Sequence, residues 1–130
     1  MEDAVCLDSD FLINFLRNKK EEITFISENE TKLRFATTFI NLFELYYGAY
    51  RSNKEENIKN VENLFYKLEI LNISIEAVKK AGKILVDLEK NGEAIDFKDL
   101  LIGCTALVEG YSIKTNNKKH FERIKDLKII

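Results

Sequence analysis

The chain has 130 residues and a mass of 15.1 kDa, a common size for one domain with its own hydrophobic core. Its composition, 45% apolar and 32% charged, excludes a disordered chain, and no apolar run is long enough for a membrane span. With 20 Lys and Arg against 22 Asp and Glu, the formal charge of −2 excludes a basic field over the whole protein, so a polyanion would need a local patch or metal ions.

The first half of the chain predicts two strands, each followed by helices. Apolar runs too short for helices predict strands at residues 4–7 and 33–37. Apolar residues at helical spacing predict helices that begin at Phe11, cover residues 20–29 and 39–50, and run from Ile58 to Leu68. Because residues 39–50 are apolar nearly all round, we expect that helix to be buried.

The second half continues this alternation. It predicts a strand at residues 71–73, a helix from Ala77 to Asn91-Gly92, a helix from Asp96 to near Gly110, a strand at 111–115, a basic helix at 118–124 and a strand at 127–130. We therefore expect an α/β protein, a three-layer α/β/α sandwich around a mostly parallel sheet, as one domain over residues 1–130. Ligands of such sheets bind beyond the carboxyl ends of the strands, near the point where the strand order reverses.

Two carboxylates follow the first predicted strand. Asp8 lies at its carboxyl end, on the side of the sheet where ligands bind, but an Asp before a helix serves equally well as an N-cap. Both interpretations of Asp8 stay open. Asp10 is most simply a first-turn carboxylate that the helix dipole favours.

Glu44 lies among apolar residues on the predicted helix 39–50. Burying a carboxylate is costly unless something pairs with it. Asn41 and Gly48 are its helical neighbours and make a polar, uncrowded strip on this helix. The residues leave two interpretations of Glu44 open, a site carboxylate or the partner of a basic side chain.

The helix that begins after Asp96 repeats this design. Asp96 is a good N-cap, Asp99 falls at the third helical position, and Gly103 lies one turn later. Asp96 is then structural, whereas Asp99 is either the second arm of a capping box or a second site carboxylate.

Carboxylates from three separate elements that meet at one edge of a sheet cannot all ionise without a compensating cation. Oxygen ligands without His or Cys at ligand spacing select Mg²⁺ or Mn²⁺, and two such ions can hydrolyse a phosphodiester through an activated water. Thr115, Asn116 and Asn117 would add hydroxyl and amide groups at the same edge, or would simply form an Asx-type turn.

Four segments, in this order and spacing, resemble PIN-domain ribonucleases and specifically the toxins of VapBC-type toxin–antitoxin pairs. The resemblance covers essentially the whole chain. Its segments are Leu7 to Ile13, Thr37 to Gly48, Ile95 to Ile102 and Thr115 to Phe121. It implies a PIN-like fold and a toxin that cuts RNA with a metal-bound water.

The resemblance also implies the roles of the site residues. Asp8, Glu44 and Asp99 would hold Mg²⁺ or Mn²⁺, and Asp10, Asp96, Asn41 and Thr115 would support them. The chain departs from the family at the last segment, where Asn117 and His120 occupy positions that often carry an acid. Asn117 would then be a neutral residue at the fourth position of the catalytic site, beside the three acids. His120 would have a surface or substrate-side role.

The implied partners are an RNA substrate, a second copy of the chain in a homodimer, and a cognate antitoxin whose basic tail occupies the acidic cleft. Basic residues near the expected site would contact RNA, namely Arg17, Lys98, Lys114, Lys118 and Lys119. Tyrosines at 46, 47 and 50, with Phe65 and Tyr66, predict a surface for a partner protein unless they only fill the core.

Two other functions remain open at this point. The run Leu7 to Leu12 also fits the DxDx signature of haloacid-dehalogenase-like phosphatases, although the paired acids that this family carries later are missing. A PIN-like fold with an idle site would be a binding module. We expect a cytoplasmic protein without a membrane segment, because Cys6 and Cys104 look like buried free thiols and the first residues lack a secretory signal.

Overall fold

The computed structural model describes residues 3–130 of the chain. Its elements in chain order are β1 (Asp3–Leu7), α1 (Ser9–Leu16), α2 (Lys20–Asn29), β2 (Leu33–Thr38), α3 (Phe39–Ser52), α4 (Glu55–Phe65), β3 (Glu69–Leu71), α5 (Ile75–Lys90), α6 (Phe97–Glu109), β4 (Ser112–Lys114) and α7 (Lys118–Phe121). No helix in this part of the chain is long and apolar enough to cross a bilayer.

The four strands form one sheet in the order β3-β2-β1-β4. Each neighbouring pair is parallel, and Cys6 of β1 lies opposite Ala36 of β2 on one side and Ile113 of β4 on the other. The chain steps from β1 to β2 to β3 in one direction and then returns to place β4 on the other side of β1. The strand order therefore reverses between β1 and β4, where ligands of parallel sheets bind.

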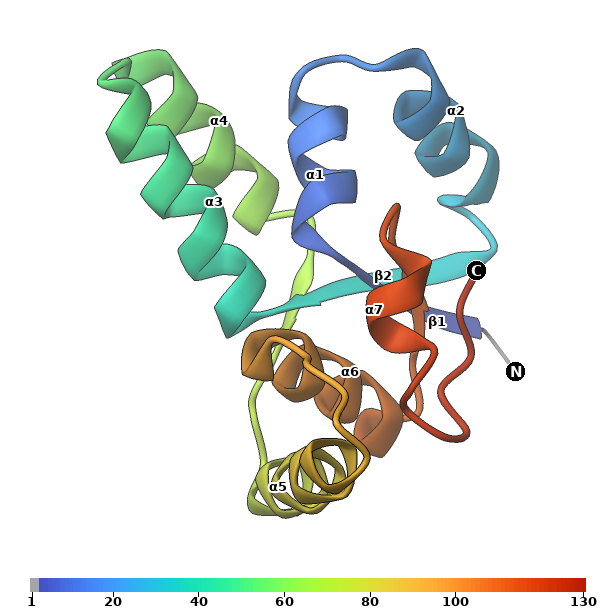
Figure 1. Cartoon of the computed structure of the whole chain (residues 1–130). Helices are drawn as coiled ribbons and strands as arrows, with labels where there is room; N and C mark the ends of the chain where they lie inside the picture. Colours follow the sequence, from blue (N-terminus) through green and yellow to red (C-terminus); the bar gives the residue numbers. More distant parts are fainter. Residues whose placement is uncertain (1–2) are drawn as a thin grey trace.

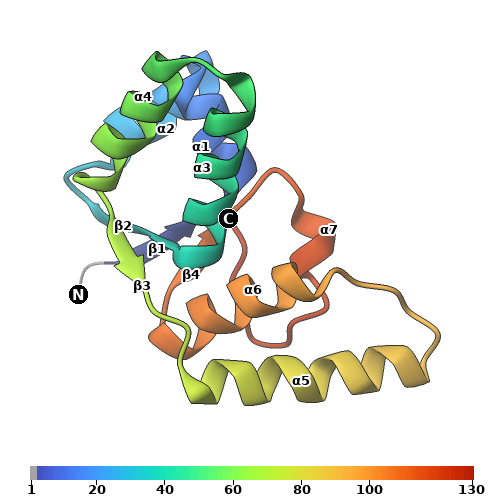
Figure 2. The same ribbon diagram turned by 90° about the vertical axis from the view of Figure 1, so that its left-hand side faces the viewer.

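Helices cover both faces of the sheet (Figures 1 and 2). On one face, α1 to α4 pack their apolar side chains against Val5 and Leu7 of β1. On the other face, α6 packs against the sheet and α5 packs along α6, together with Ile113, Phe121 and Ile124. The three-layer α/β/α sandwich and its parallel sheet are confirmed.

Successive residues of β1 point to opposite layers, as a strand requires. Val5 and Leu7 enter the core under α1 to α4, whereas Cys6 enters a third cluster with Ala36 and Ala106. Both faces of the strand are buried, which explains its continuous apolar run. The two cysteines are buried free thiols, as predicted.

Gly103 allows α6 to approach the C-terminal segment closely. A Cβ on Gly103 would collide with the side chain of Ile124 and crowd Phe121. The expectation of an uncrowded strip along this helix is therefore wrong, because the side chain of Ile124 occupies the space beside Gly103. Gly48 differs, since nothing lies within 4 Å of the place that its Cβ would take.

Three predicted elements are displaced or absent. The strand expected at residues 71–73 lies at Glu69–Leu71, where it pairs with residues 36–38 of β2. Residues 127–130 form no strand and make only a single parallel bridge, between Ile129 and Ile113. The basic helix expected to reach residue 124 ends at Phe121.

Helix α3 is not buried on every side. Its Leu45 and Ala49 face the core, but aromatic side chains on its outer face stay exposed: Phe39 49%, Phe43 66%, Tyr47 56% and Tyr50 63%. The rings of Phe43 and Tyr47 stack on each other, as do those of Tyr46 and Tyr50. The apolar pattern of this helix could not show which side chains are buried within the chain and which form a face that a partner protein would cover.

Candidate active site at the carboxyl edge of the sheet

Asp8 follows β1 at the point where the strand order reverses. Its side chain is 6% exposed and makes no capping hydrogen bond to α1. Instead, Oδ1 accepts from Asn41 Nδ2 at 2.9 Å and Oδ2 accepts from Thr115 Oγ1 at 2.8 Å. Asp8 therefore occupies the N-cap position of α1 without capping the helix through its side chain, and α3 and the end of β4 both hold this carboxylate.

Asn41 is oriented by the first turn of α3. Thr38 caps this helix in a capping box, and Asn41 Oδ1 accepts from the Thr38 hydroxyl at 2.7 Å. The oxygen of the amide is thereby used locally, so its nitrogen donates to Asp8 and, at 2.8 Å, to Ser9 Oγ. The predicted supporting residue Asn41 thus joins α3 to the start of α1.

Glu44 is half-buried on α3 and accepts a hydrogen bond from Ser9 Oγ at 2.8 Å. Ser9 in turn accepts from Asn41, so a continuous chain of hydrogen bonds links Asp8, Asn41, Ser9 and Glu44. Within residues 3–130, Glu44 has no ion pair with a Lys or Arg. The interpretation of Glu44 as the partner of a basic side chain is therefore wrong.

Asp99 enters the site from the first turn of α6. Asp96 caps this helix by accepting from the Lys98 amide at 2.9 Å, as predicted. The Asp99 carboxylate is instead 3.0 Å from His120 Nδ1 on α7, a contact that the sequence did not reveal. Burial raises the pKa of Asp99, His120 opposes this shift, and the negative charges of Asp8 and Asp96 add to it.

Asp10 holds the loop that follows β4. Its Oδ2 accepts from the Asn116 amide at 3.1 Å and from Asn117 Nδ2 at 2.9 Å. Burial, and then the charge of Asp8, raises the pKa of Asp10. Asn117 makes no side-chain cap on α7, and it is Thr115 Oγ1 that accepts from the Asn117 amide. The expected turn is present in its threonine form, closed by the Thr115 hydroxyl, and the Asn117 side chain in addition donates to Asp10.

The chemistry of these donors fits a hard divalent cation. The charge of Asp8 acts on both Asp10 and Asp99, and the available ligands are oxygen atoms rather than sulfur. The described residues do not, however, form a ready-made cluster of three or more ligands. Ser9, Asn41, Thr115 and His120 each contact one carboxylate oxygen, and because an oxygen that accepts one hydrogen bond keeps a second lone pair, the acids can share an ion while these partners hold them.

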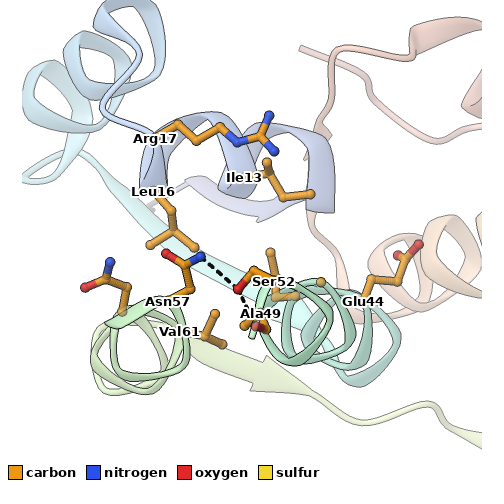
Figure 3. Close-up of a pocket in the computed structure, with 11 residues that line it drawn as sticks. Ile13, Leu16, Arg17, Glu44, Ala49, Ser52, Asn57 and Val61 are labelled. Carbon is orange, nitrogen blue, oxygen red and sulfur yellow. Dashed lines mark hydrogen bonds between the residues drawn. The ribbon is translucent and has the colours of Figure 1, made fainter. Parts of the chain in front are cut away.

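A pocket of about 200 Å³ adjoins Glu44 between α1, α3 and α4 (Figure 3). Ile13 and Leu16 of α1 lie across from Ala49 of α3 and Val61 of α4. The Glu44 carboxylate is directed away from the α4 side of the pocket (Figure 3). A largely apolar pocket therefore lies beside Glu44, at one end of the group of polar site residues.

The five predicted RNA-contact residues differ in their surroundings. Arg17 lines the pocket beside Glu44, and Lys98 lies 4.0 Å from Asp96. Lys114 is less available, since its ammonium group lies over the Phe25 ring, 4.8 Å from the centroid. Lys118 and Lys119 are exposed on α7, next to His120.

The sequence analysis missed three side chains of this hydrogen-bond network, those of Ser9, Asn14 and Glu22. Ser9 bridges Asn41 and Glu44, and Glu22 accepts from Asn14 and Asn116. The only available signal for Ser9 was its position between two acids. Nothing in the pattern of α2 distinguished Glu22 from its exposed neighbour Glu21.

The sequence of this chain is similar to the sequences of known nucleases. The family model of the PIN domain matches residues 5–127. The chain is 33% identical to Ribonuclease VapC1 of Methanocaldococcus jannaschii over 96% of this chain and 84% of that protein. It is also 33% identical to the tRNA(fMet)-specific endonuclease VapC of Salmonella typhimurium, over 95% of this chain and 93% of that protein.

A solved structure shows a similar fold. The crystal structure of VapBC2 from Rickettsia felis, bound to a DNA fragment from its promoter, contains a chain that superposes with a TM-score of 0.88. The two chains are 27% identical, and the superposition covers 98% of this chain and 97% of that one.

Proposed function

The chain belongs to the PIN domain family and is a VapC-type endoribonuclease, and we propose that Asp8, Glu44 and Asp99 hold its divalent metal. The observation that supports this most is the chain of hydrogen bonds from Asp8 through Asn41 and Ser9 to Glu44. It brings carboxylates of separate elements to the reversal point of the sheet. Neither the site nor the relatives favour a phosphatase or an idle binding module.

The family uses divalent metal ions, and we propose Mg²⁺ or Mn²⁺ because oxygen donors suit these ions. When bound, such an ion supplies a Lewis acid that activates water and stabilises the leaving oxygen of an RNA phosphodiester. The chain's own groups orient the ligands: Asn41 and Thr115 hold Asp8, Ser9 holds Glu44, and His120 holds Asp99.

RNA cleavage with and without Mn²⁺ tests this proposal, with Glu44→Gln as the diagnostic variant. Gln keeps the shape and can still accept from Ser9, but it removes the charge that the ion needs. We expect cleavage to fall about 100-fold, which is roughly 2.7 kcal/mol of transition-state stabilisation. Thermal unfolding should be nearly unchanged, since no ion pair is broken. Full cleavage by the folded variant would contradict the assignment of Glu44.

The partner of this toxin is a cognate antitoxin, and we propose that the exposed aromatic face of α3 lies in a protein interface. Phe43 and Tyr47 stack on each other while remaining more than half exposed, which is unusual for residues without a partner. A homodimer is the second assembly that we propose. We place the protein in the cytoplasm as one PIN-like domain over residues 1–130, consistent with its two buried free thiols.

We propose that Lys118 and Lys119 contact RNA phosphates beside the site. Binding to single-stranded RNA should weaken as salt rises, with a shallow slope, because the protein as a whole carries a charge of −2. Replacing both lysines with Gln should reduce the slope of log K against log salt by about 1.4, or roughly 0.7 for each lost phosphate contact.

The matched control for this measurement is Lys54→Gln with Lys59→Gln. These two lysines are also exposed, but they lie at the start of α4 and within it, away from α7 (Figure 1). Their replacement should leave the slope unchanged. Equal effects of the two double variants would contradict a local RNA surface on α7.

A further prediction concerns Asn117, whose amide donates to Asp10 at 2.9 Å. In Asn117→Asp, two carboxylates would face each other, so the metal-free protein should lose about 1 kcal/mol of stability, the upper range for an exposed charge pair. Mn²⁺ should remove this loss, and calorimetry should show tighter metal binding than in the parent. Unchanged metal affinity would mean that residue 117 does not face the ion.

A further inference from the structure

Glu22 on α2 is a buried carboxylate outside the group of residues assigned to the metal. Its side chain is 5% exposed. Its Oε2 accepts two amide hydrogen bonds, from Asn14 Nδ2 at 3.0 Å and from Asn116 Nδ2 at 3.3 Å. Asn14 belongs to the preceding helix α1 and Asn116 to the loop after β4, so Glu22 joins two consecutive helices to a loop that is 94 residues away in sequence.

The loop after β4 is held on two sides. Thr115 points inward and donates to Asp8 at 2.8 Å, whereas the next residue, Asn116, points to Glu22. The backbone amide of Asn116 is tied at 3.1 Å to Asp10, which lies one helical turn before Asn14 on α1. Successive residues of the loop are thus anchored in alternate directions, which leaves Thr115 little freedom to leave Asp8.

The charge of Glu22 strengthens its part of this arrangement. The hydrogen bond from Asn14 is the main cause that lowers the pKa of Glu22, and Asn116 and the charge of Lys114 act in the same direction. Hydrogen bonds to an ionised acceptor are roughly twice as strong as those between neutral groups. A carboxylate at this position therefore holds the Asn116 amide better than a neutral acceptor would.

We propose that Glu22 is a positioning residue for RNA cleavage, which acts through Asn116 to keep Thr115 on Asp8. The hydrogen bonds of Glu22 go to Asn14 and Asn116 and not to a proposed metal ligand. This role rests on the proposed function, because it concerns the orientation of Asp8. It assigns to α2 a task in the site, whereas the family resemblance assigned none to this helix.

The test compares Glu22→Ala with Glu21→Ala. Glu21 is adjacent, exposed and borders the same hollow beside Asn116, so its replacement removes the same charge without touching the loop. In Glu22→Ala we expect kcat for RNA cleavage to fall about 10- to 100-fold, the usual loss for a residue behind a metal ligand. The KM for RNA should change less than about twofold, since uniform substrate binding is not affected. Glu22→Gln, which keeps one acceptor oxygen, should recover part of kcat.

A double-mutant cycle separates this role from a loss of stability. Asn116→Ala breaks the same bond from the other side, so the double variant should have the kcat of the more damaged single variant instead of the product of both losses. Independent losses in the double variant would overturn the proposal. So would an unchanged kcat in Glu22→Ala, assayed below the melting temperature of each variant.

Hydrogen exchange gives a readout that does not depend on nuclease activity. The amides of Asn116 and Asn117, bonded to Asp10 and Thr115, should exchange faster in Glu22→Ala than in Glu21→Ala. Equal exchange in both variants would overturn the positioning role even if RNA is cleaved. Absence of metal-dependent cleavage in the parent protein would instead contradict the proposed function, while exchange still tests the contact between Glu22 and the loop.

Discussion

The Asp8→Asn variant should lose RNA cleavage by about 1,000-fold while it keeps its fold. A metal ligand at the reacting phosphate is worth several kcal/mol in the transition state, and each 1.36 kcal/mol is a factor of ten in rate. Asn in this position can still accept from Asn41, and the Thr115 hydroxyl can reverse to accept from its amide. We therefore expect single-turnover cleavage to slow by about 1,000-fold without a change in far-UV circular dichroism.

The stability of Asp8→Asn supplies a second measurement. Burial is the main cause of the raised pKa of Asp10 and Asp99, and the charge of Asp8 adds to both. An acid with a raised pKa binds more protons in the folded state, so these groups lower stability as pH rises through the carboxyl range. Removal of the Asp8 charge weakens this effect. Without metal, the variant should gain stability relative to the parent between about pH 4 and pH 7.

Asp96→Asn is the matched control for this experiment. Asp96 caps α6 from an exposed position, and Asn is an equally good N-cap residue. Its replacement should leave cleavage within about twofold and stability within about 0.5 kcal/mol of the parent, as for an ordinary surface substitution. If both variants lost cleavage equally, the special role of Asp8 would be contradicted.

Saturating Mn²⁺ should raise the melting temperature of the protein by about 10 °C. An ion at 100 times its Kd stabilises the folded state by about 2.7 kcal/mol, and each kcal/mol moves the melting temperature of a domain this size by roughly 3 to 5 °C. The ion neutralises carboxylates whose pKa burial and mutual repulsion now raise. Differential scanning calorimetry with Mn²⁺ and with a chelator measures the effect.

Asp99→Asn should remove most of this metal-induced shift, since it deletes the carboxylate that α6 contributes. His120 can still contact the amide oxygen at this position, so the metal-free variant should melt close to the parent. Glu21→Gln, on the exposed side of α2, should keep the full shift. A melting temperature indifferent to Mn²⁺ in the parent protein would contradict a metal site at this edge.

Local patterns in the sequence predicted most of the fold. The helix over residues 20–29 has the predicted bounds, and the next helix after it begins at Phe39 as expected. These elements follow from apolar spacing and from capping residues such as Thr38, which act over a few positions. Displaced elements, such as β3 and the segment 127–130, depend on pairing with a distant strand, which local spacing does not report.

The candidate site, like the fold, could be predicted only in part from the sequence. The types and order of Asp8, Glu44 and Asp99 were enough to predict a metal-dependent nuclease through resemblance, and family membership is confirmed. The sequence alone could not decide whether Asp8 was a cap, because its partner Thr115 is 107 residues away.

The chain by itself determined which residue types were available and where helices and strands begin. Only the tertiary structure decided which of them meet: Thr115 with Asp8, His120 with Asp99, and Glu22 with Asn116. The reason is physical. These hydrogen bonds join elements that become neighbours only when β4 returns to the side of β1 opposite β2, and α2 and α7 lie beside that edge by packing that no local pattern encodes.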